Sequence, residues 1–118
     1  MRSDADRLSD ILEAIAKIRE RITDSIQAFQ GDEVLQVWVI HHLQVIGEAA
    51  RNVSQSLKDR HSEVPWPQIV ALRNILVHEY FGLNMHQVWT MAQKDLLLLE
   101  EQVQHIRSQI AADPGSGA

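Results

Sequence analysis

The sequence has no cysteine among its 118 residues, and only 3 prolines and 5 glycines. The absence of cysteine excludes disulfide frameworks, thiolate zinc sites and cysteine nucleophiles. No apolar run approaches the ~18 residues that a membrane span needs. The N-terminal stretch MRSDADRLSD carries acidic residues where a signal peptide has an apolar core. We therefore expect a cytoplasmic protein with no membrane partner.

Positive charge is also scarce, because 11 Lys and Arg face 16 Asp and Glu, which gives a formal net charge of −5. Nucleic-acid binders usually show a basic domain or stripe, so any such activity here must rest on a local patch. The sequence contains neither a glycine-rich phosphate loop nor a His-Glu-any-any-His motif. No second ligand follows His41 or His42 at a chelating spacing, so we assign both a structural or interfacial role. We expect no metal and no cofactor.

What is present is the pattern of one helical domain, predicted over residues 1–112, with 45% hydrophobic residues. Apolar residues recur every three or four positions, which indicates four helices. They run from about 8 to 29, 33 to 58, 67 to 82 and 85 to 111. No alternating pattern persists as a strand would require, so we predict an all-α antiparallel bundle of four to five helices. The tail, 113–118, is expected to be disordered or a cloning remnant.

Local signals support these helices. Ser3 and Asp6 resemble a capping box at the start of the first helix. The second helix is apolar nearly all round in its first half, which indicates a central position in the bundle. Gly47 lies inside that helix, where glycine costs about 1 kcal/mol relative to alanine. Its expected use is the close approach of a neighbouring helix. Trp38, Trp66 and Trp89 are expected to be core or interface anchors.

The predicted third helix carries a polar face. At about 100° per residue, taking Arg73 as zero, Asn74 lies near 100°, His78 near 140° and Tyr80 near −20°. The opposite side is apolar, with Ile69, Leu72 and Leu76. A guanidinium offers planar donors to a phosphate, and an imidazole changes charge near neutral pH. This face could therefore serve metal-free phosphoryl chemistry, with Arg73 holding the phosphate, His78 moving a proton and Asn74 orienting the imidazole or a ribose hydroxyl.

Two readings of this face stay open on spacing alone. The polar residues could instead pair with Glu48 or with backbone carbonyls and only tie helices together. Glu48 itself could pair with Arg73, or with Arg51 or Asn52 on its own helix. Cleavage of RNA profits from a base and an acid, whereas one helix offers a single histidine. A two-fold dimer with the third helices facing each other would bring both copies of His78 into one cleft.

The motif RNILVHEY, residues 73–80, resembles the Arg, four residues, His, any residue, Tyr signature of the HepT-like group of HEPN-domain proteins. The segments IGEAARNV and RHSEVPWPQIVALRN resemble its flanking regions, and the resemblance extends to Val88 and Trp89. It implies a HEPN-like helical bundle that acts as a homodimer. It further implies a metal-independent endoribonuclease that cuts RNA by attack of the ribose 2′-hydroxyl at a composite dimer site, as the toxin of a type VII toxin–antitoxin pair.

The same resemblance implies roles for individual residues. Arg73 and His78 match the catalytic pair, and Asn74 matches the polar residue after the arginine. Tyr80 matches the tyrosine to which an MNT-type nucleotidyltransferase antitoxin transfers AMP, which would repel an RNA phosphate. Glu48 is a supporting residue. The candidates for further RNA contacts are Arg51, Lys58 and Arg60, although a solvated charged face is the more common role of such residues.

Two alternatives to the nuclease remain at this stage. One is a noncatalytic HEPN binding module in which the same helix docks a nucleotidyltransferase or a nucleotide. The other is a dimeric helical adaptor, in which Arg73 and Tyr80 matter only for stability.

Overall fold

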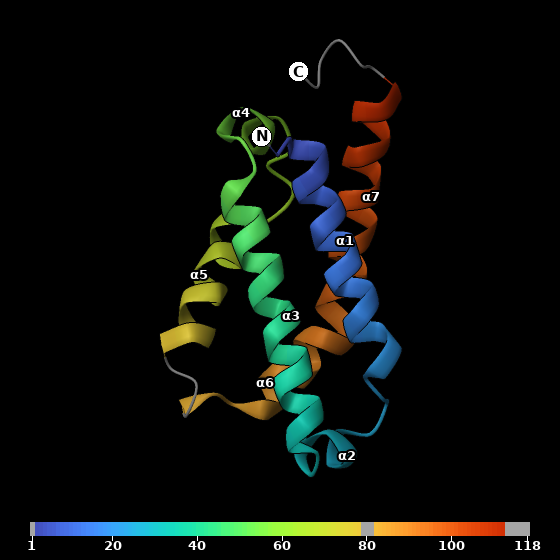
Figure 1. The fold of residues 1–118 in the computed structure, drawn as a ribbon, viewed down its shortest axis with the longest axis vertical. Helices are drawn as coiled ribbons and strands as arrows, with labels where there is room; N and C mark the ends of the chain where they lie inside the picture. The colour runs from blue at the N-terminus through green and yellow to red at the C-terminus, as the bar shows by residue number, and fades with distance from the viewer. Residues whose placement is uncertain (1, 79–81, 113–118) are drawn as a thin grey trace.

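A computed structural model describes residues 2–78 and 82–112 of the chain. Within these residues every regular element is helical, as the sequence predicts. The elements are α1 (Asp4–Arg21), α2 (Ile26–Gln30), α3 (Glu33–Asn52), α4 (Gln55–Arg60), α5 (Trp66–His78), α6 (Met85–Thr90), a π-helical segment (Met91–Asp95) and α7 (Leu96–Ala112). Figure 1 shows α1, α3, α5 and α7 running alternately down and up the long axis of the molecule.

The core lies around α3, which packs against both α1 and α5, while α7 packs against α1. This central position agrees with the nearly continuous apolar surface of α3. Fully buried side chains come from α1, α3, α5 and α7 alike, among them Leu8, Ile15, Leu43, Leu76 and Ile106. The predicted capping box is confirmed, because the Ser3 hydroxyl accepts from the Asp6 N–H at 3.2 Å and the Ser3 N–H donates to the Asp6 carboxylate at 3.0 Å.

The first predicted helix ends earlier than expected, at Arg21 instead of about residue 29. Ile22 is extended, with φ −69° and ψ 140°. The Ser25 hydroxyl then caps the separate short helix α2 by accepting from the Ala28 N–H at 3.1 Å. A serine that bonds the backbone locally offers the chain an alternative to continuing a helix, which explains the break within an apolar stripe.

The second predicted helix also ends early, at Asn52 instead of about residue 58. Val53 is extended, and the Ser54 hydroxyl caps α4 by accepting from the Leu57 N–H at 3.2 Å. The Asp4 carboxylate of α1 accepts from the Ser54 N–H at 2.9 Å and from its hydroxyl at 2.6 Å. This break therefore depends on a contact with a residue 50 positions away, which helical periodicity does not report.

The third predicted helix begins at Trp66, with Pro67 in its first turn as expected. The fourth predicted helix is helical from Met85 to Ala112. It is divided into α6 and α7 by the π-helical segment at Met91–Asp95, which interrupts the α-helical hydrogen bonding. The hydrogen bonds of a π-helical turn span one residue more than those of an α-helix, so the side chains that follow are rotated about the helix axis. None of the described helices combines the length and apolar character that crossing a membrane would need.

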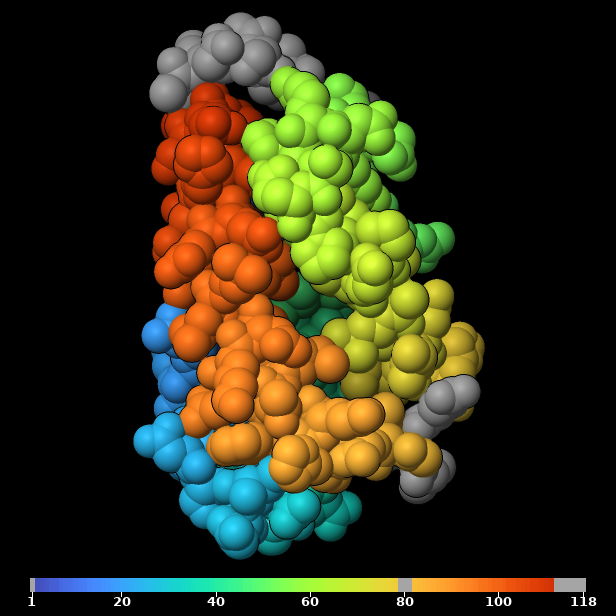
Figure 2. Space-filling view, turned by 180° about the vertical axis from the view of Figure 1, so that it is seen from behind, coloured from blue at the N-terminus to red at the C-terminus, as the bar shows by residue number. Residues whose placement is uncertain are grey.

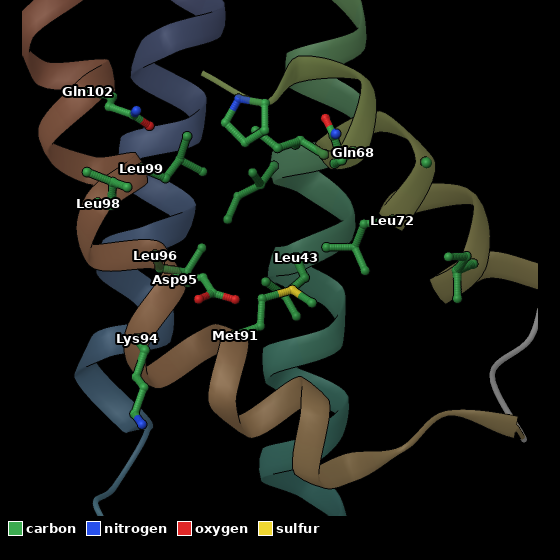
Figure 3. Close-up of a pocket in the computed structure, with 15 residues that line it drawn as sticks. Leu43, Gln68, Leu72, Met91, Lys94, Asp95, Leu96, Leu98, Leu99 and Gln102 are labelled. Carbon is green, nitrogen blue, oxygen red and sulfur yellow. The ribbon is translucent and has the colours of Figure 1, made fainter. Parts of the chain in front are cut away.

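An open groove separates α5 from the π-helical segment and α7, and Figure 2 shows it as a hollow on the back of the molecule. We call it the α5–α7 groove. It holds about 780 Å³ and has Leu43 and Ile46 of α3 among its lining residues. Leu72 and Leu99 point into it from opposite walls (Figure 3). Two further wall residues are about half exposed, Ile75 at 45% and Leu98 at 59%.

Candidate active site on α5

Helices α3 and α5 approach each other closely at Gly47. A Cβ atom at this position would lie 2.4 Å from the Arg73 Cβ and 3.2 Å from the Ile69 carbonyl oxygen. Only a residue without a side chain fits, so the predicted use of Gly47 is confirmed. Because the Arg73 Cβ rests against the α3 backbone, the start of the arginine side chain has a fixed position beside the next residue of α3, Glu48.

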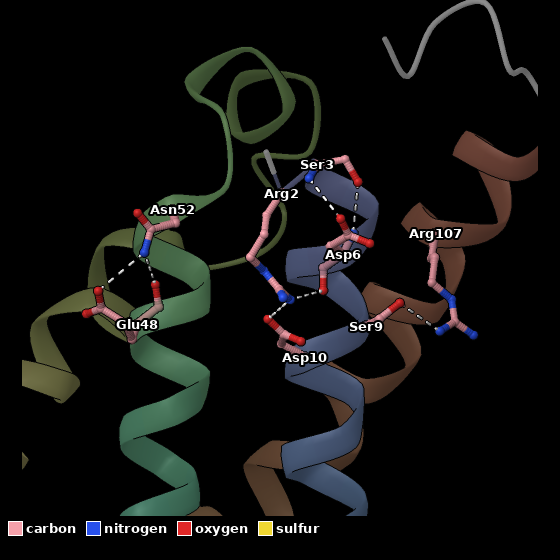
Figure 4. Close-up of polar contacts among 8 residues, drawn as sticks. All are labelled: Arg2, Ser3, Asp6, Ser9, Asp10, Glu48, Asn52 and Arg107. Atoms are coloured by element: carbon pink, nitrogen blue, oxygen red, sulfur yellow. Dashed lines mark hydrogen bonds and ion pairs between the residues drawn. The ribbon is translucent and has the colours of Figure 1, made fainter.

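Glu48 forms the negative centre of the site. Its Oε2 lies 3.2 Å from the Arg73 Nε and 3.7 Å from an Arg51 guanidinium nitrogen. Its Oε1 accepts from the Asn52 amide at 3.3 Å, and the same amide donates to the Glu48 carbonyl at 2.8 Å (Figure 4). Oε2 is shielded from solvent but no donor is aligned on it, so charge attraction holds the arginine there. The two pairings left open by the sequence therefore coexist.

The Arg73 guanidinium makes a second contact, since its Nη1 donates to the Asn74 Oδ1 at 3.2 Å. The sequence spacing had left open whether Asn74 would orient the His78 imidazole or a ribose hydroxyl. Within the described residues the contacts of Arg73 involve Nε and Nη1 but not Nη2, and 30% of the side chain is exposed. A guanidinium held from one side in this way can present its remaining donors to an external phosphate.

Asn74 and His78 are both exposed on α5, which ends at His78. The opposite side of α5 is occupied by the core, with Leu76 buried and Ile69 and Leu72 packed against buried residues. The two faces predicted for this helix are thus present. Gln44 of α3 donates to the Leu76 carbonyl at 3.4 Å, which provides a partner for one of the carbonyls at the end of α5. Tyr80 lies outside the described residues.

Two of the three proposed RNA-contact residues lie together beside this site. The Lys58 ammonium donates to the Arg51 carbonyl at 3.3 Å, and Arg51 in turn pairs with Glu48. Arg60 instead donates to the Ser56 carbonyl on its own helix at 3.4 Å. A local cluster of positive charge therefore exists on this acidic protein, with Arg73, Arg51 and Lys58 connected through one carboxylate and one carbonyl.

The remaining histidine and tryptophan candidates have structural surroundings. His42 is 8% exposed, and its ring meets Trp38 edge-on with 4.5 Å between ring centroids. Burial lowers the pKa of His42 below its ordinary value. The three tryptophans donate their indole N–H groups to backbone carbonyls, those of Lys17, His61 and Thr23. No cluster of three or more His, Cys, Asp or Glu is placed to hold a metal ion within residues 2–78 and 82–112.

The protein is therefore an all-helical bundle, and Arg73, Asn74 and His78 on α5 form its candidate site for phosphate binding and proton transfer. The family model Ribonuclease HepT-like matches residues 11–106, and the chain belongs to this HepT-like ribonuclease family. The match includes α5 and most of α1 and α7.

Individual relatives agree with this assignment. A "Putative RNase" of Caldanaerobacter subterraneus subsp. tengcongensis is 36% identical over 107 residues, which cover 90% of this chain and 96% of that protein. The "Probable ribonuclease HepT" of Thermococcus cleftensis is 35% identical over 107 residues, covering 90% and 97%. A "Putative RNase" of Methanocaldococcus jannaschii is 33% identical over 98 residues, covering 82% and 90%. No solved structure matches the chain.

Proposed function

We propose that this protein is a metal-independent endoribonuclease, the toxin of a type VII HEPN/MNT pair. The observation that carries the proposal is the anchoring of Arg73 by Glu48 on a helix that exposes Asn74 and His78. The names of the relatives support the choice of RNA as substrate. The cluster of Arg73, Arg51 and Lys58 supplies positive charge for the phosphate backbone, which an acidic protein needs at its substrate site.

In the proposed reaction Arg73 binds the scissile phosphate and the negative charge that develops on it. One His78 takes the proton of the ribose 2′-hydroxyl, whose oxygen then forms a bond to phosphorus. The bond from phosphorus to the 5′ oxygen breaks, and a second His78 gives that oxygen a proton. The products are a 2′,3′-cyclic phosphate and a 5′-hydroxyl. Asn74 helps to hold the Arg73 guanidinium, with its amide N–H donors left for a ribose hydroxyl.

A second His78 requires a second copy of the chain, so we propose a two-fold dimer across the α5–α7 groove. Ile75 precedes His78 by one helical turn, and its exposed side chain lines this groove together with Leu98. Burying these apolar side chains against the same surface of a partner would bring the two α5 helices, and hence both His78 side chains, toward one cleft. Burial of this apolar surface would therefore stabilise the dimer that the proposed reaction requires.

We further propose that a nucleotidyltransferase antitoxin silences the enzyme by transferring AMP to Tyr80. This part rests on the resemblance of the motif, because Tyr80 lies outside the described residues. It is tested by incubating the protein with the antitoxin and ATP and measuring intact mass. Wild-type protein should gain one adenylyl group and lose activity, and Tyr80→Phe should do neither. Modification of the Tyr80→Phe variant would place the acceptor elsewhere.

The nuclease itself is tested with purified protein, RNA and excess chelator. We expect cleavage by the wild-type protein, and a loss of about 10²- to 10⁴-fold in His78→Ala and in Arg73→Ala, the range that general acid–base and electrostatic groups supply. Arg107→Ala is the matched control, because Arg107 contacts Ser9 on the α1–α7 side of the bundle (Figure 4). Full activity in His78→Ala would make the proposed mechanism wrong. No cleavage, together with a stable antitoxin complex, would favour the noncatalytic module.

A further inference from the structure

A second hollow lies between α4 and the first turns of α5, on the other side of α5 from the α5–α7 groove. We call it the α4–α5 pocket, and it holds about 500 Å³, within the range of ~300–1,000 Å³ typical of small-ligand sites. Buried Val64 and Trp66 contribute to its lining, together with the more accessible Pro67 and Val70. Lys58 and Ser62 add polar groups. The pocket thus combines apolar walls with polar side chains, as small-ligand sites do.

The pocket continues the candidate active site along one side of α5. At about 100° per residue and with Arg73 as zero, Pro67 lies near 120° and Val70 near 60°, beside Asn74 near 100° and His78 near 140°. These positions form one stripe, and Val70 precedes Asn74 by four residues, or about 6 Å along the helix axis. The exposed apolar residues of the groove, Ile75 and Leu98, lie off this stripe. A dimer formed across the groove therefore leaves the pocket side of α5 free.

Positively charged side chains connect the α4–α5 pocket with the candidate active site at Arg73. Lys58 lines the pocket and donates to the Arg51 carbonyl at 3.3 Å, while Arg51 and Arg73 share the Glu48 carboxylate. A polyanion bound at Arg73 would meet Arg51 and Lys58 next. The one carboxylate in the pocket lining, Asp59, already accepts from the Gln55 amide at 2.9 Å, which partly offsets its repulsion of a phosphate. The indole of Trp66 is fixed by its bond to the His61 carbonyl at 3.0 Å, so the wall is rigid.

We propose that the α4–α5 pocket binds the base of a nucleotide that flanks the scissile dinucleotide in single-stranded RNA, with Lys58 contacting the phosphate of that flanking nucleotide. The inference rests on the proposed nuclease function and extends it to the recognition of the substrate. Single-stranded RNA has unstacked bases that apolar and aromatic walls can bind, together with a backbone that follows a positively charged path. With this pocket the enzyme would recognise RNA strands that are longer than the scissile dinucleotide.

The test measures binding of fluorescent 2′-O-methyl oligonucleotides, which cannot be cut because the attacking hydroxyl is blocked. A hexamer and a dinucleotide are compared on the full-length protein. Lys58→Gln removes the charge at the pocket, and Val70→Phe fills it. Lys17→Gln, on α1, is the control for the same loss of charge away from the pocket. Circular dichroism and thermal unfolding show which variants are folded, and Lys58→Gln keeps the test valid if the bulkier Phe disturbs packing.

We expect both pocket variants to bind the hexamer about tenfold more weakly and the dinucleotide within about twofold of the wild type, since one stacked base or one phosphate contact is worth about that much. Lys58→Gln should also reduce the slope of log affinity against log salt by about 0.7. Unchanged hexamer binding in both variants, or equal weakening of hexamer and dinucleotide, would overturn the pocket proposal. Because these probes are not cleaved, the expected pattern in a protein without nuclease activity would contradict the nuclease proposal and leave the pocket standing.

Discussion

At the scale of single residues, Glu48 places a carboxylate against Arg73, the arginine proposed to bind RNA. The contact is on Nε, with 3.2 Å between Nε and Oε2, so it orients the guanidinium from the side and leaves Nη2 unoccupied among the described contacts. The pair is part-exposed, with 30% of the Arg73 side chain and 46% of the Glu48 side chain accessible. A pair of this exposure contributes only about 0–1 kcal/mol to stability, so its effect should lie in positioning.

We predict that Glu48→Ala lowers kcat/KM for RNA about five- to tenfold, because Arg73 loses the orientation that its proposed role requires. The free energy of unfolding should change by less than about 1 kcal/mol. Glu100→Ala provides the matched control, since Glu100 pairs with Arg19 between α1 and α7. Cleavage assays and urea unfolding on both variants decide the matter. Equal activity in the two variants would remove Glu48 from the site.

His42 makes stability depend on pH. Its pKa is lowered by burial first, and then by the neighbouring charges of His41 and Lys17, while Glu13 opposes the shift. The unfolded chain therefore takes up a proton near the ordinary pKa of about 6.5, which the folded protein binds only at lower pH. This contribution to stability is complete above about pH 6.5 and is lost as the pH falls from there toward the folded pKa.

We predict that thermal stability decreases below about pH 6.5, by at most about 1.4 kcal/mol per pH unit from this single group. His42→Gln should flatten that part of the profile, because no imidazole remains to be protonated. His105→Gln, on the exposed side of α7, should leave the profile unchanged. Thermal unfolding measured between pH 5 and 8 checks the prediction, and identical slopes in wild type and His42→Gln would refute it.

At the scale of elements, the contact between α3 and α5 decides where Arg73 lies. We predict that Gly47→Ala destabilises the protein by about 1–3 kcal/mol, because the new Cβ would lie 2.4 Å from the Arg73 Cβ and α5 would have to move. The better helix propensity of alanine offsets about 1 kcal/mol of this cost. Cleavage should fall as well, since Arg73 shifts relative to Glu48.

Gly31→Ala is the control for this substitution. Its Cβ would come no closer than 3.5 Å, to the Gln27 carbonyl oxygen, and its φ of −91° suits any residue. Urea unfolding and RNA cleavage are measured on both variants. If Gly47→Ala matches Gly31→Ala in both, close helix approach does not position the arginine.

The sequence predicted which segments are helical, but it predicted the ends of the helices less well. The apolar stripe of residues 8–29 is a real periodicity, but Ser25 starts a new helix within it. The break after α3 is held by a hydrogen bond between Ser54 and Asp4, which are 50 residues apart. The π-helical segment at Met91–Asp95 left no signal in the spacing of apolar residues, because the leucines that follow it are apolar in any register.

At the scale of the whole molecule, the α5–α7 groove is the surface on which the proposed composite site depends. We predict that the protein is a dimer and that Ile75→Asp with Leu98→Asp makes it monomeric, because a buried unpaired carboxylate is strongly unfavourable. The double variant should keep its helical circular dichroism and lose RNA cleavage. Val34→Asp is the control, because Val34 is 81% exposed but lies outside the groove. Sedimentation equilibrium measures the mass, and a wild-type monomer that still cleaves RNA would contradict the composite site.

The sequence by itself determined the helical class, the two faces of α5 and the pairing of Gly47 with a neighbouring helix. These follow from local rules, because side-chain periodicity and the size of glycine act within one element. Only the tertiary structure decided that Glu48 holds Arg73 and Arg51 at once, that Ile75 and Leu98 line one groove, and that the α4–α5 pocket lies beside the stripe of Asn74 and His78 on α5. Those arrangements join residues from different helices, and the relative placement of helices depends on packing that no single segment specifies.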